Sequence, residues 1–244
     1  MADQAQLLTS PDMGAITFLA GSSFATLSGF RGNPFGATGT ANVAVFQSGS
    51  TYTHNAGNDP FALTAPASKA VFQPGSTFVV RASSGFTADG RAYANLTVDN
   101  STALTASGTG TFQFQTLLVN TGSSFTFSGS SAAAVKITGN ITSSGSGNVA
   151  LTSGTGGIAF IGGSVETAGG GGGTGTVTLG GNVTVASGTT LELIRAITVS
   201  SGTVTVNGAF QLDQNGGISA SSMSYGAGAS LAFAHTSGTV TISV

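Results

Sequence analysis

The sequence contains no cysteine and no tryptophan, and only 6% of its 244 residues are charged. Without cysteine, neither disulfide bonds nor thiolate metal sites can form. Ordinary globular domains carry about 25% charged residues, so this chain is poor in the groups from which most active sites are built. Its six basic residues are widely separated and its net charge is −2, so no basic stripe can neutralise several phosphates. We therefore expect no nucleic-acid partner.

Long hydrophobic runs and helical periodicity are also missing. No long segment repeats apolar residues at i, i+3, i+4 and i+7, whereas alternating runs are common. Residues 1–21 have an acidic start, no basic region, and an apolar stretch interrupted by Thr17. We expect neither a signal peptide nor a spanning helix there, and no membrane insertion.

Glycine and phenylalanine are abundant instead, with 39 and 16 residues. Short alternating runs rich in Val, Thr and Phe are typical of β-strands, and glycine between them is typical of turns. A disordered chain would be poor in aromatic and β-branched residues. The composition therefore predicts an all-β fold, and 40% hydrophobic residues suffice for a continuous core.

One phrase recurs along the chain: a glycine, one or two small residues, then alternating apolar residues. It reads GSSFAT from Gly21, GSTYTH from Gly49, GSTFVV from Gly75, GSSFTF from Gly122, GTTLEL from Gly188 and GASLAF from Gly228. Two copies match over a longer stretch, because VFQSGSTY from Val45 and VFQPGSTF from Val71 share six of eight positions 26 residues apart. A repeat of this length is typical of one coil of a solenoid.

The later copies fit the same interpretation. Steps of 47, 66 and 40 residues correspond to two, three and two coils, which gives 20–28 residues per coil and about ten coils. We predict an all-β fold, a parallel and right-handed β-solenoid with short strands and Gly-rich corners. It forms a single domain over residues 1–244, with a soft boundary near residues 89–100.

Each position of the phrase has an expected place in this coil. The glycine marks a corner with positive φ, the Ser or Thr begins an outward-facing edge, and the larger apolar residue joins a core ladder.

Separate short strands are expected at 183–185, 191–193, 197–199 and 204–206. An antiparallel β-sandwich is the alternative, because Asn207-Gly208 and Asn215-Gly216 are typical of hairpin turns.

Residues 45–100 resemble a known group of proteins. The phrases FQSGSTYTHNAGNDPF, FQPGSTFVV and YANLTVDNSTALTASGTGTF are similar to repeats of large secreted β-solenoid proteins of Bacteroidetes. Those repeats contain Y-x-N-L-x-[IV]-x-N, which Tyr93, Asn95, Leu96, Val98 and Asn100 match. From Gly173 the chain is also similar to autotransporter passenger repeats. The resemblance implies a secreted or cell-surface bacterial protein with a structural or adhesive role, and it transfers no catalytic residue.

The densest polar cluster comprises His54, Asn55, Asn58 and Asp59, which could border a calcium or sugar site. Calcium takes six to eight oxygen ligands, and this cluster offers one carboxylate. A turn in which Asn and Asp bond their own backbone explains the cluster equally. We expect His54 to be exposed in a loop and too far from His235 for a shared role, and we expect no metal or other cofactor.

Two acids offer a second candidate site. Glu192 and Asp213 are 21 residues apart, about one coil, so they could stack on one face and share a cation or act together on a polysaccharide. Two solvated acids one coil apart are the plainer interpretation.

Threonine pairs offer a third candidate site. The pairs at 51/53, 176/178, 203/205 and 239/241 have the spacing of a threonine ladder that could order water on ice. The threonine pairs are intermittent along the sequence.

The glycines at 169–173 lead into a strand rather than a helix, so they do not form a nucleotide site.

These observations favour a non-enzymatic extracellular structural protein, a fibre, sheath, matrix or adhesin module at a bacterial surface. Its expected partner is a second copy of itself, joined end to end, or a surface polysaccharide. The alternative is a carbohydrate- or ice-binding module. A polysaccharide-degrading enzyme ranks third because the chain has so few charged residues from which to build an active site.

Overall fold

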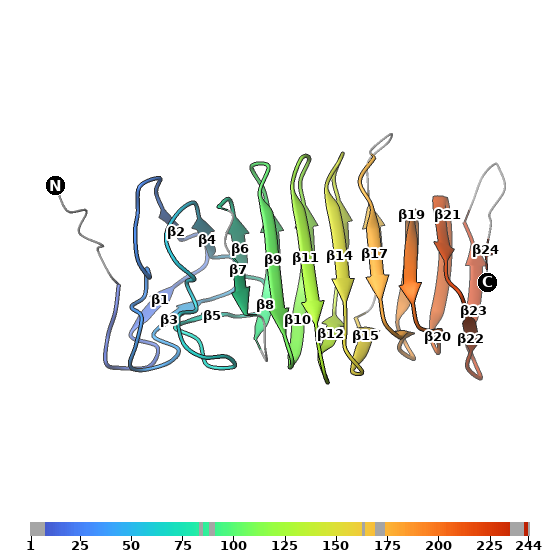
Figure 1. The fold of residues 1–244 in the computed structure, drawn as a ribbon, viewed down its shortest axis with the longest axis horizontal. Coiled ribbons are helices and arrows are strands. Elements are labelled where there is room, and N and C mark those ends of the chain that lie inside the picture. Colours follow the sequence, from blue (N-terminus) through green and yellow to red (C-terminus); the bar gives the residue numbers. More distant parts are fainter. Residues whose placement is uncertain are drawn as a thin grey trace.

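The computed structural model describes residues 8–82, 85–87, 91–162, 164–168, 174–234 and 242–243. They form a parallel β-solenoid without helices, and successive coils stack from β1 at one end to β22 at the other (Figure 1). In the part of the chain described, no helix is long and apolar enough to cross a membrane. Predictions that involve residues 89, 169–173, 235 and 239–241 lie outside the described residues.

Each complete coil has three faces, which we number in chain order. Face 1 contains β1 (Ile16–Phe18), β3 (Ala44–Phe46), β5 (Ala70–Phe72), β12 (Ala134–Ile137), β15 (Gly157–Phe160), β18 (Val183–Val185), β20 (Val204–Val206) and β22 (Met223–Tyr225). Face 2 contains β2 (Ser23–Thr26), β4 (Thr51–His54), β6 (Thr77–Val80), β13 (Ile141–Ser143), β16 (Ser164–Ala168) and β23 (Ser230–Phe233). Face 3 contains β7 (Gly85–Thr87), β9 (Ala103–Gly108), β11 (Ser124–Gly129), β14 (Asn148–Thr152), β17 (Val177–Gly180) and β24 (Ile242–Ser243).

Four longer strands bend around a corner and contribute to two faces. They are β8 (Ala92–Val98) and β10 (Thr111–Val119), from face 1 to face 2, and β19 (Thr190–Ser201) and β21 (Ala209–Ser219), from face 2 to face 3. The separate strands expected at 191–193 and 197–199 are therefore one strand, β19, with irregular register between Leu193 and Ala196. The strands expected at 183–185 and 204–206 are confirmed as β18 and β20.

Every strand pairing among the described residues is parallel, which excludes the antiparallel sandwich. Val45 pairs with Val71 and Tyr52 with Phe78, so the 26-residue repeat in the sequence is one coil. Because successive coils pair in register, equivalent residues of the repeat stack directly on one another. The solenoid predicted from the sequence is confirmed.

The core consists of ladders of inward side chains. Phe46 stacks on Phe18 and Phe72 with ring centroids 4.3 and 5.0 Å away, and Tyr52 stacks on Phe78 at 5.4 Å. Toward the C-terminus the aromatic residues give way to Val, Leu and Ile, which are also buried. Such aromatic contacts each contribute about 0.5–1.5 kcal/mol beyond the area that they bury.

The repeated phrase builds a β-turn at a corner. Its six glycines, Gly21, Gly49, Gly75, Gly122, Gly188 and Gly228, have φ between 77 and 86°, as predicted. At residues 73–76 the Ser76 N–H donates to Gln73 O at 2.9 Å, with Pro74 and Gly75 between them. Pro followed by a positive-φ Gly is the type II turn, in which a side chain at Gly75 would be strained and would also meet Ser48 Oγ.

The residue after the phrase glycine does not face outward, contrary to prediction. Ser50 and Ser76 are completely buried, and each hydroxyl donates to the carbonyl three residues earlier, at 2.6 and 2.7 Å. The turn places this side chain beneath the corner, where the bent backbone offers a carbonyl acceptor. The hydroxyl therefore satisfies a buried turn carbonyl rather than solvent.

The number of turns also differs from the ten expected. The solenoid has about seven turns. The first two coils have strands on faces 1 and 2 only, with irregular segments, residues 27–43 and 55–69, on the third side. The phrase also changes corner. Gly75 lies between faces 1 and 2 and Gly122 between faces 2 and 3, so the steps of 47 and 66 residues are not whole numbers of coils.

We predict that the core ladder dominates stability. Phe112→Ala should lower the free energy of unfolding by about 3–5 kcal/mol, because Phe112 is completely buried against Phe125 and Phe127. Gln113→Ala, the outward neighbour on the same strand, should change it by less than about 0.5 kcal/mol. Urea unfolding followed by far-UV circular dichroism measures the unfolding free energy of both variants. Equal effects of the two substitutions would contradict the alternation of inward and outward side chains along β10.

Candidate functional site

His54 lies inside the solenoid, not in an exposed loop as expected. It is the last residue of β4 and is completely buried, in register between Thr26 and Val80. Its Nδ1 lies 2.8 Å from the Tyr52 hydroxyl, and its Nε2 has no hydrogen-bond partner among the described residues. Burial lowers the pKa of His54 to about 4, so the ring is neutral at pH 7.

The other members of the polar cluster hold a turn together. Asn55 Nδ2 donates to Thr26 O at 2.7 Å, and the Asn58 N–H donates to Gly32 O at 2.8 Å. Asp59 Oδ1 accepts the N–H of Phe61 at 2.8 Å, which is a turn in which an Asp side chain bonds its own backbone two residues on. The Asn55 side chain thus binds the preceding coil, Asn58 does so through its main chain, and Asp59 bonds within its own segment.

Asp59 also faces a buried arginine. Arg91 Nη1 lies 3.8 Å from Asp59 Oδ2, and the Arg91 guanidinium carbon lies 4.8 Å from the Phe61 ring centre. The same guanidinium donates to the carbonyls of Leu63 and Ala67 at 2.6 and 2.9 Å. Burial raises the pKa of Asp59, and the hydrogen bond from Phe61 and the Arg91 charge only partly offset this.

Basic side chains elsewhere have similar partners. The buried Lys69 ammonium donates to Thr40 O at 2.7 Å, and Arg195 donates to Ser143 O and Gly175 O at 3.1 and 2.5 Å. Each cation therefore binds main-chain carbonyls of another coil or of an irregular segment. These groups fasten the corners of the solenoid.

Glu192 and Asp213 are not register partners, so they do not stack on one another. The register of β19 and β21 places Gln211 opposite Glu192, and Gln211 Nε2 donates to Glu192 Oε1 at 3.1 Å. One coil at this position contains 19 residues rather than 21, so Asp213 lies beyond the rung of Glu192. No group of three or more metal-ligating His, Asp or Glu side chains occurs in the described ranges.

The threonine pairs named above lie on three different faces. Thr51 and Thr53 belong to face 2, Thr178 to face 3 and Thr205 to face 1. Face 3 does have an in-register column in which one alanine interrupts the threonines: Thr105, Thr126, Ala150, Thr178 and Thr198. Strands β9, β11, β14 and β17 contain no charged residue.

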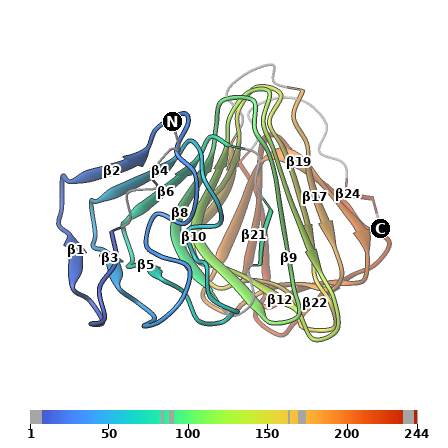
Figure 2. The same cartoon turned by 60° about the vertical axis from the view of Figure 1, so that its left-hand side comes forward.

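The ladder of face 1 is interrupted between β5 and β8. Strand β5 pairs with β3, and the first residues of β8 pair with β10, but β5 and β8 do not pair with each other. On face 2 the coils shorten at this point, from 28 and 26 residues to 18. The cross-section therefore narrows, and β1, β3 and β5 diverge from the strands that follow (Figure 2).

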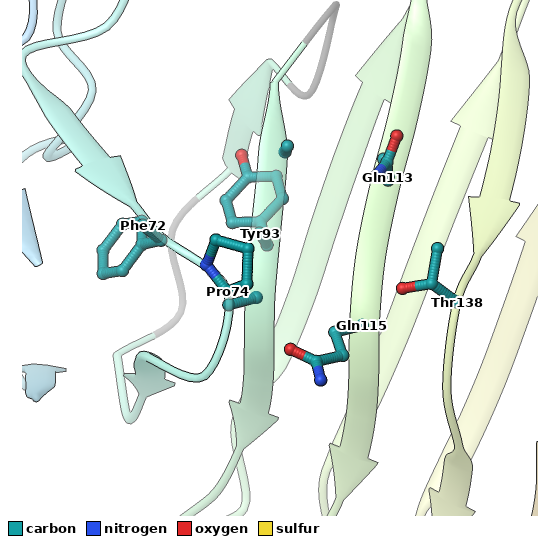
Figure 3. A pocket seen from close by; sticks show the side chains of 8 residues that line it. Phe72, Pro74, Tyr93, Gln113, Gln115 and Thr138 are labelled. Carbon is teal, nitrogen blue, oxygen red and sulfur yellow. The ribbon is translucent and has the colours of Figure 1, made fainter. Parts of the chain in front are cut away.

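A groove of about 320 Å³ occupies this interruption. Phe72 and Pro74 line one side, and Gln113, Gln115 and Thr138 line the other (Figure 3). Ala92, Tyr93 and Ala94 of β8 lie between them. A smaller cavity of about 150 Å³ shares Phe72 and Ala92 and extends toward Arg91 and Asn42.

A hydrogen bond spans the groove at one end. Gln115 Oε1 accepts the N–H of Gly75 at 3.1 Å, which ties the bend of β10 to the turn after β5. The residues that line the main groove carry no formal charge. Sequence reasoning missed this site, although the alternation in TFQFQT places Gln113 and Gln115 on the outer surface.

Comparisons with protein-family models, curated proteins and solved structures gave no match for this chain.

The buried imidazole predicts a pH dependence of stability. The folded-state pKa of His54, about 4, lies below its unfolded value near 6.5, so the unfolded chain binds a proton that the folded chain excludes. Stability should fall as the pH drops from 6.5 to 4, by about 3 kcal/mol from this group. The variant His54→Val should lack this component.

Urea unfolding of both proteins at several pH values measures the difference. Asp59 is present in both, so its raised pKa, which favours the folded state on acidification, cancels in the comparison. Parallel pH profiles for the wild type and the variant would show that His54 is not buried in its neutral form.

Proposed function

We propose that the chain is a non-enzymatic extracellular structural module, part of a fibre, sheath, matrix or adhesin at a bacterial surface. The observation that carries this proposal is the unbroken in-register ladder of face 2, which links the first described coil to the last. A stack in which each coil contacts its neighbours resists bending and extends in one direction. Such a body suits a load-carrying or spacing role.

The use of charge supports the same proposal. Arg91, Arg195 and Lys69 bind main-chain carbonyls, and Arg81 pairs with Asp99 at 3.0 Å. Charged groups that fasten the scaffold are not available for general acid–base chemistry. The resemblance of residues 45–100 to repeats of secreted Bacteroidetes proteins supports the extracellular location.

Both end coils support association of one copy with another. The last described coil exposes Tyr225, Leu231 and Phe233, and the first exposes Leu19 and Leu27 by 60% and 72%. Among the described residues, the strands of each end coil also have one backbone edge without a partner strand. We infer that the end of one molecule stacks on the opposite end of the next, a head-to-tail contact that builds an open filament.

Electron microscopy of negatively stained protein at increasing concentration tests this assembly. Rods that lengthen by whole molecules are expected. Leu231→Lys should reduce their mean length at least tenfold, because it puts a charge into the contact, whereas Ala232→Lys, on the outward side of the same strand, should not. Single particles at every concentration would contradict the assembly.

Ice binding is a second candidate, favoured by the threonine column of face 3. Rungs of a parallel sheet repeat at about 4.8 Å and alternate residues at about 6.6 Å, so the hydroxyls have a regular spacing that is interrupted at Ala150. Thr105 and Thr198 are exposed, and Ser107, Ser128 and Thr152 form a second column beside the first. An uncharged array of this kind can order water in a lattice.

Thermal hysteresis measures this activity. If face 3 binds ice, Thr126→Tyr in the middle of the column should abolish the hysteresis. Thr184→Tyr, an outward threonine of face 1, should leave it unchanged. Absence of hysteresis in the wild-type protein at millimolar concentration would eliminate this candidate and leave the structural proposal intact.

A further inference from the structure

We propose that the groove between β5 and β8 binds one unit of a neutral carbohydrate chain. This inference goes beyond the structural role and does not depend on end-to-end assembly. Its basis is the interrupted ladder, which creates a concave site with both polar and apolar walls on an otherwise regular surface.

The size of the groove fits a small ligand. Its volume of about 320 Å³ lies at the lower end of the range of about 300–1,000 Å³ typical of small-molecule sites. Ala92 is exposed at the start of β8 and pairs with Gln113 of β10. The small methyl of Ala92 therefore leaves room in the middle of the groove, where a larger side chain would fill it.

The walls match the two kinds of surface that a sugar ring presents. Gln113, Gln115 and Thr138 supply amide and hydroxyl groups that can both donate and accept hydrogen bonds, as sugar hydroxyls require. Exposed Pro74, together with the small exposed part of the mostly buried Phe72, supplies the apolar surface opposite, which suits the C–H groups of a pyranose (Figure 3). Because no lining residue is charged, a neutral sugar fits better than an acidic one.

The polar wall is held in place before a ligand arrives. Gln113 lies within the β10 ladder, paired with Ala92 on one side and Lys136 on the other. Gln115 is fixed by its bond to the Gly75 N–H, so its oxygen is engaged and its amide N–H groups remain for a ligand. Preorganised side chains lose less conformational entropy on binding.

An extended peptide is a poorer occupant. The edge of β5 that has no partner strand among the described residues could accept a strand, but β5 has only three residues. The bond between Gln115 and Gly75 also crosses one end of the groove, in the path of a strand that continues beyond β5. A short ring-shaped ligand avoids this obstacle.

Nuclear magnetic resonance titration tests the proposal. Neutral hexasaccharides of glucose, mannose, xylose and N-acetylglucosamine would be added one at a time to the ¹⁵N-labelled full chain. At least one should shift the amide signals of Gly75, Ala92, Gln113 and Thr138 in a saturable way. Absence of saturable shifts at these residues with all the sugars would overturn the proposal.

Variants identify the groups involved. Gln113→Ala and Gln115→Ala should each weaken binding about fivefold to tenfold, the effect of losing about 1 kcal/mol of hydrogen bonding. Ala92→Phe should abolish it by filling the groove. Gln211→Ala, an outward amide on face 2, should leave the affinity unchanged.

Two further results would overturn the proposal. One is equal or tighter binding of acidic hexauronates, and the other is a saturable shift of the same signals by a β-strand peptide but not by any sugar. Thermal unfolding of each variant shows whether it is folded, and Thr138→Ala provides a second substitution in the polar wall should Gln115→Ala fail to fold. Failure of sugar binding would leave the filament assay unaffected, so the two proposals can be distinguished.

Discussion

Parallel, in-register pairing between successive coils is the constraint on which the rest of the structure depends. It places like residues on one another, so Phe46 stacks between Phe18 and Phe72, and Tyr52 lies on Phe78. It also pairs the main chain of the inner strands on both sides, except at the interruption of the face 1 ladder, where β5 pairs with β3 alone. The cations that are present bind carbonyls where the chain leaves the ladder, as Arg195 does at Ser143 and Gly175.

The sequence was sufficient to predict the fold class, because in-register pairing requires similar side chains at a fixed spacing, as at Val45 and Val71. The corner used by each phrase could not be predicted in the same way, since the same turn fits two different corners, as Gly75 and Gly122 show. The burial of His54 could have been foreseen. In the segment TYTH, inward Tyr52 implies inward His54 two residues later, but the polarity of histidine favoured an exposed position.

The groove was beyond reach of sequence reasoning for a different reason. It depends on a change in coil length between β6 and β8, which separates β5 from β8 on face 1 while the ladder continues on face 2. Neither the change in coil length nor the separation of β5 from β8 can be recognised from a residue type or a motif. A regular solenoid would offer only flat faces and corners, so its one described interruption in the face 1 ladder is where a small ligand can be enclosed.

Engineered disulfides test the register most directly, because the chain has no cysteine of its own. Thr184, Thr205 and Ser224 form one outward column on successive rungs of face 1. The pair Thr184→Cys and Thr205→Cys should form an intramolecular disulfide under mild oxidation, since adjacent rungs bring Cα atoms within the range of about 4.4–6.8 Å that a disulfide spans. The pair Thr184→Cys and Ser224→Cys, two rungs apart, should remain reduced in the monomer. Efficient crosslinking of the second pair, or none in the first, would contradict the in-register solenoid.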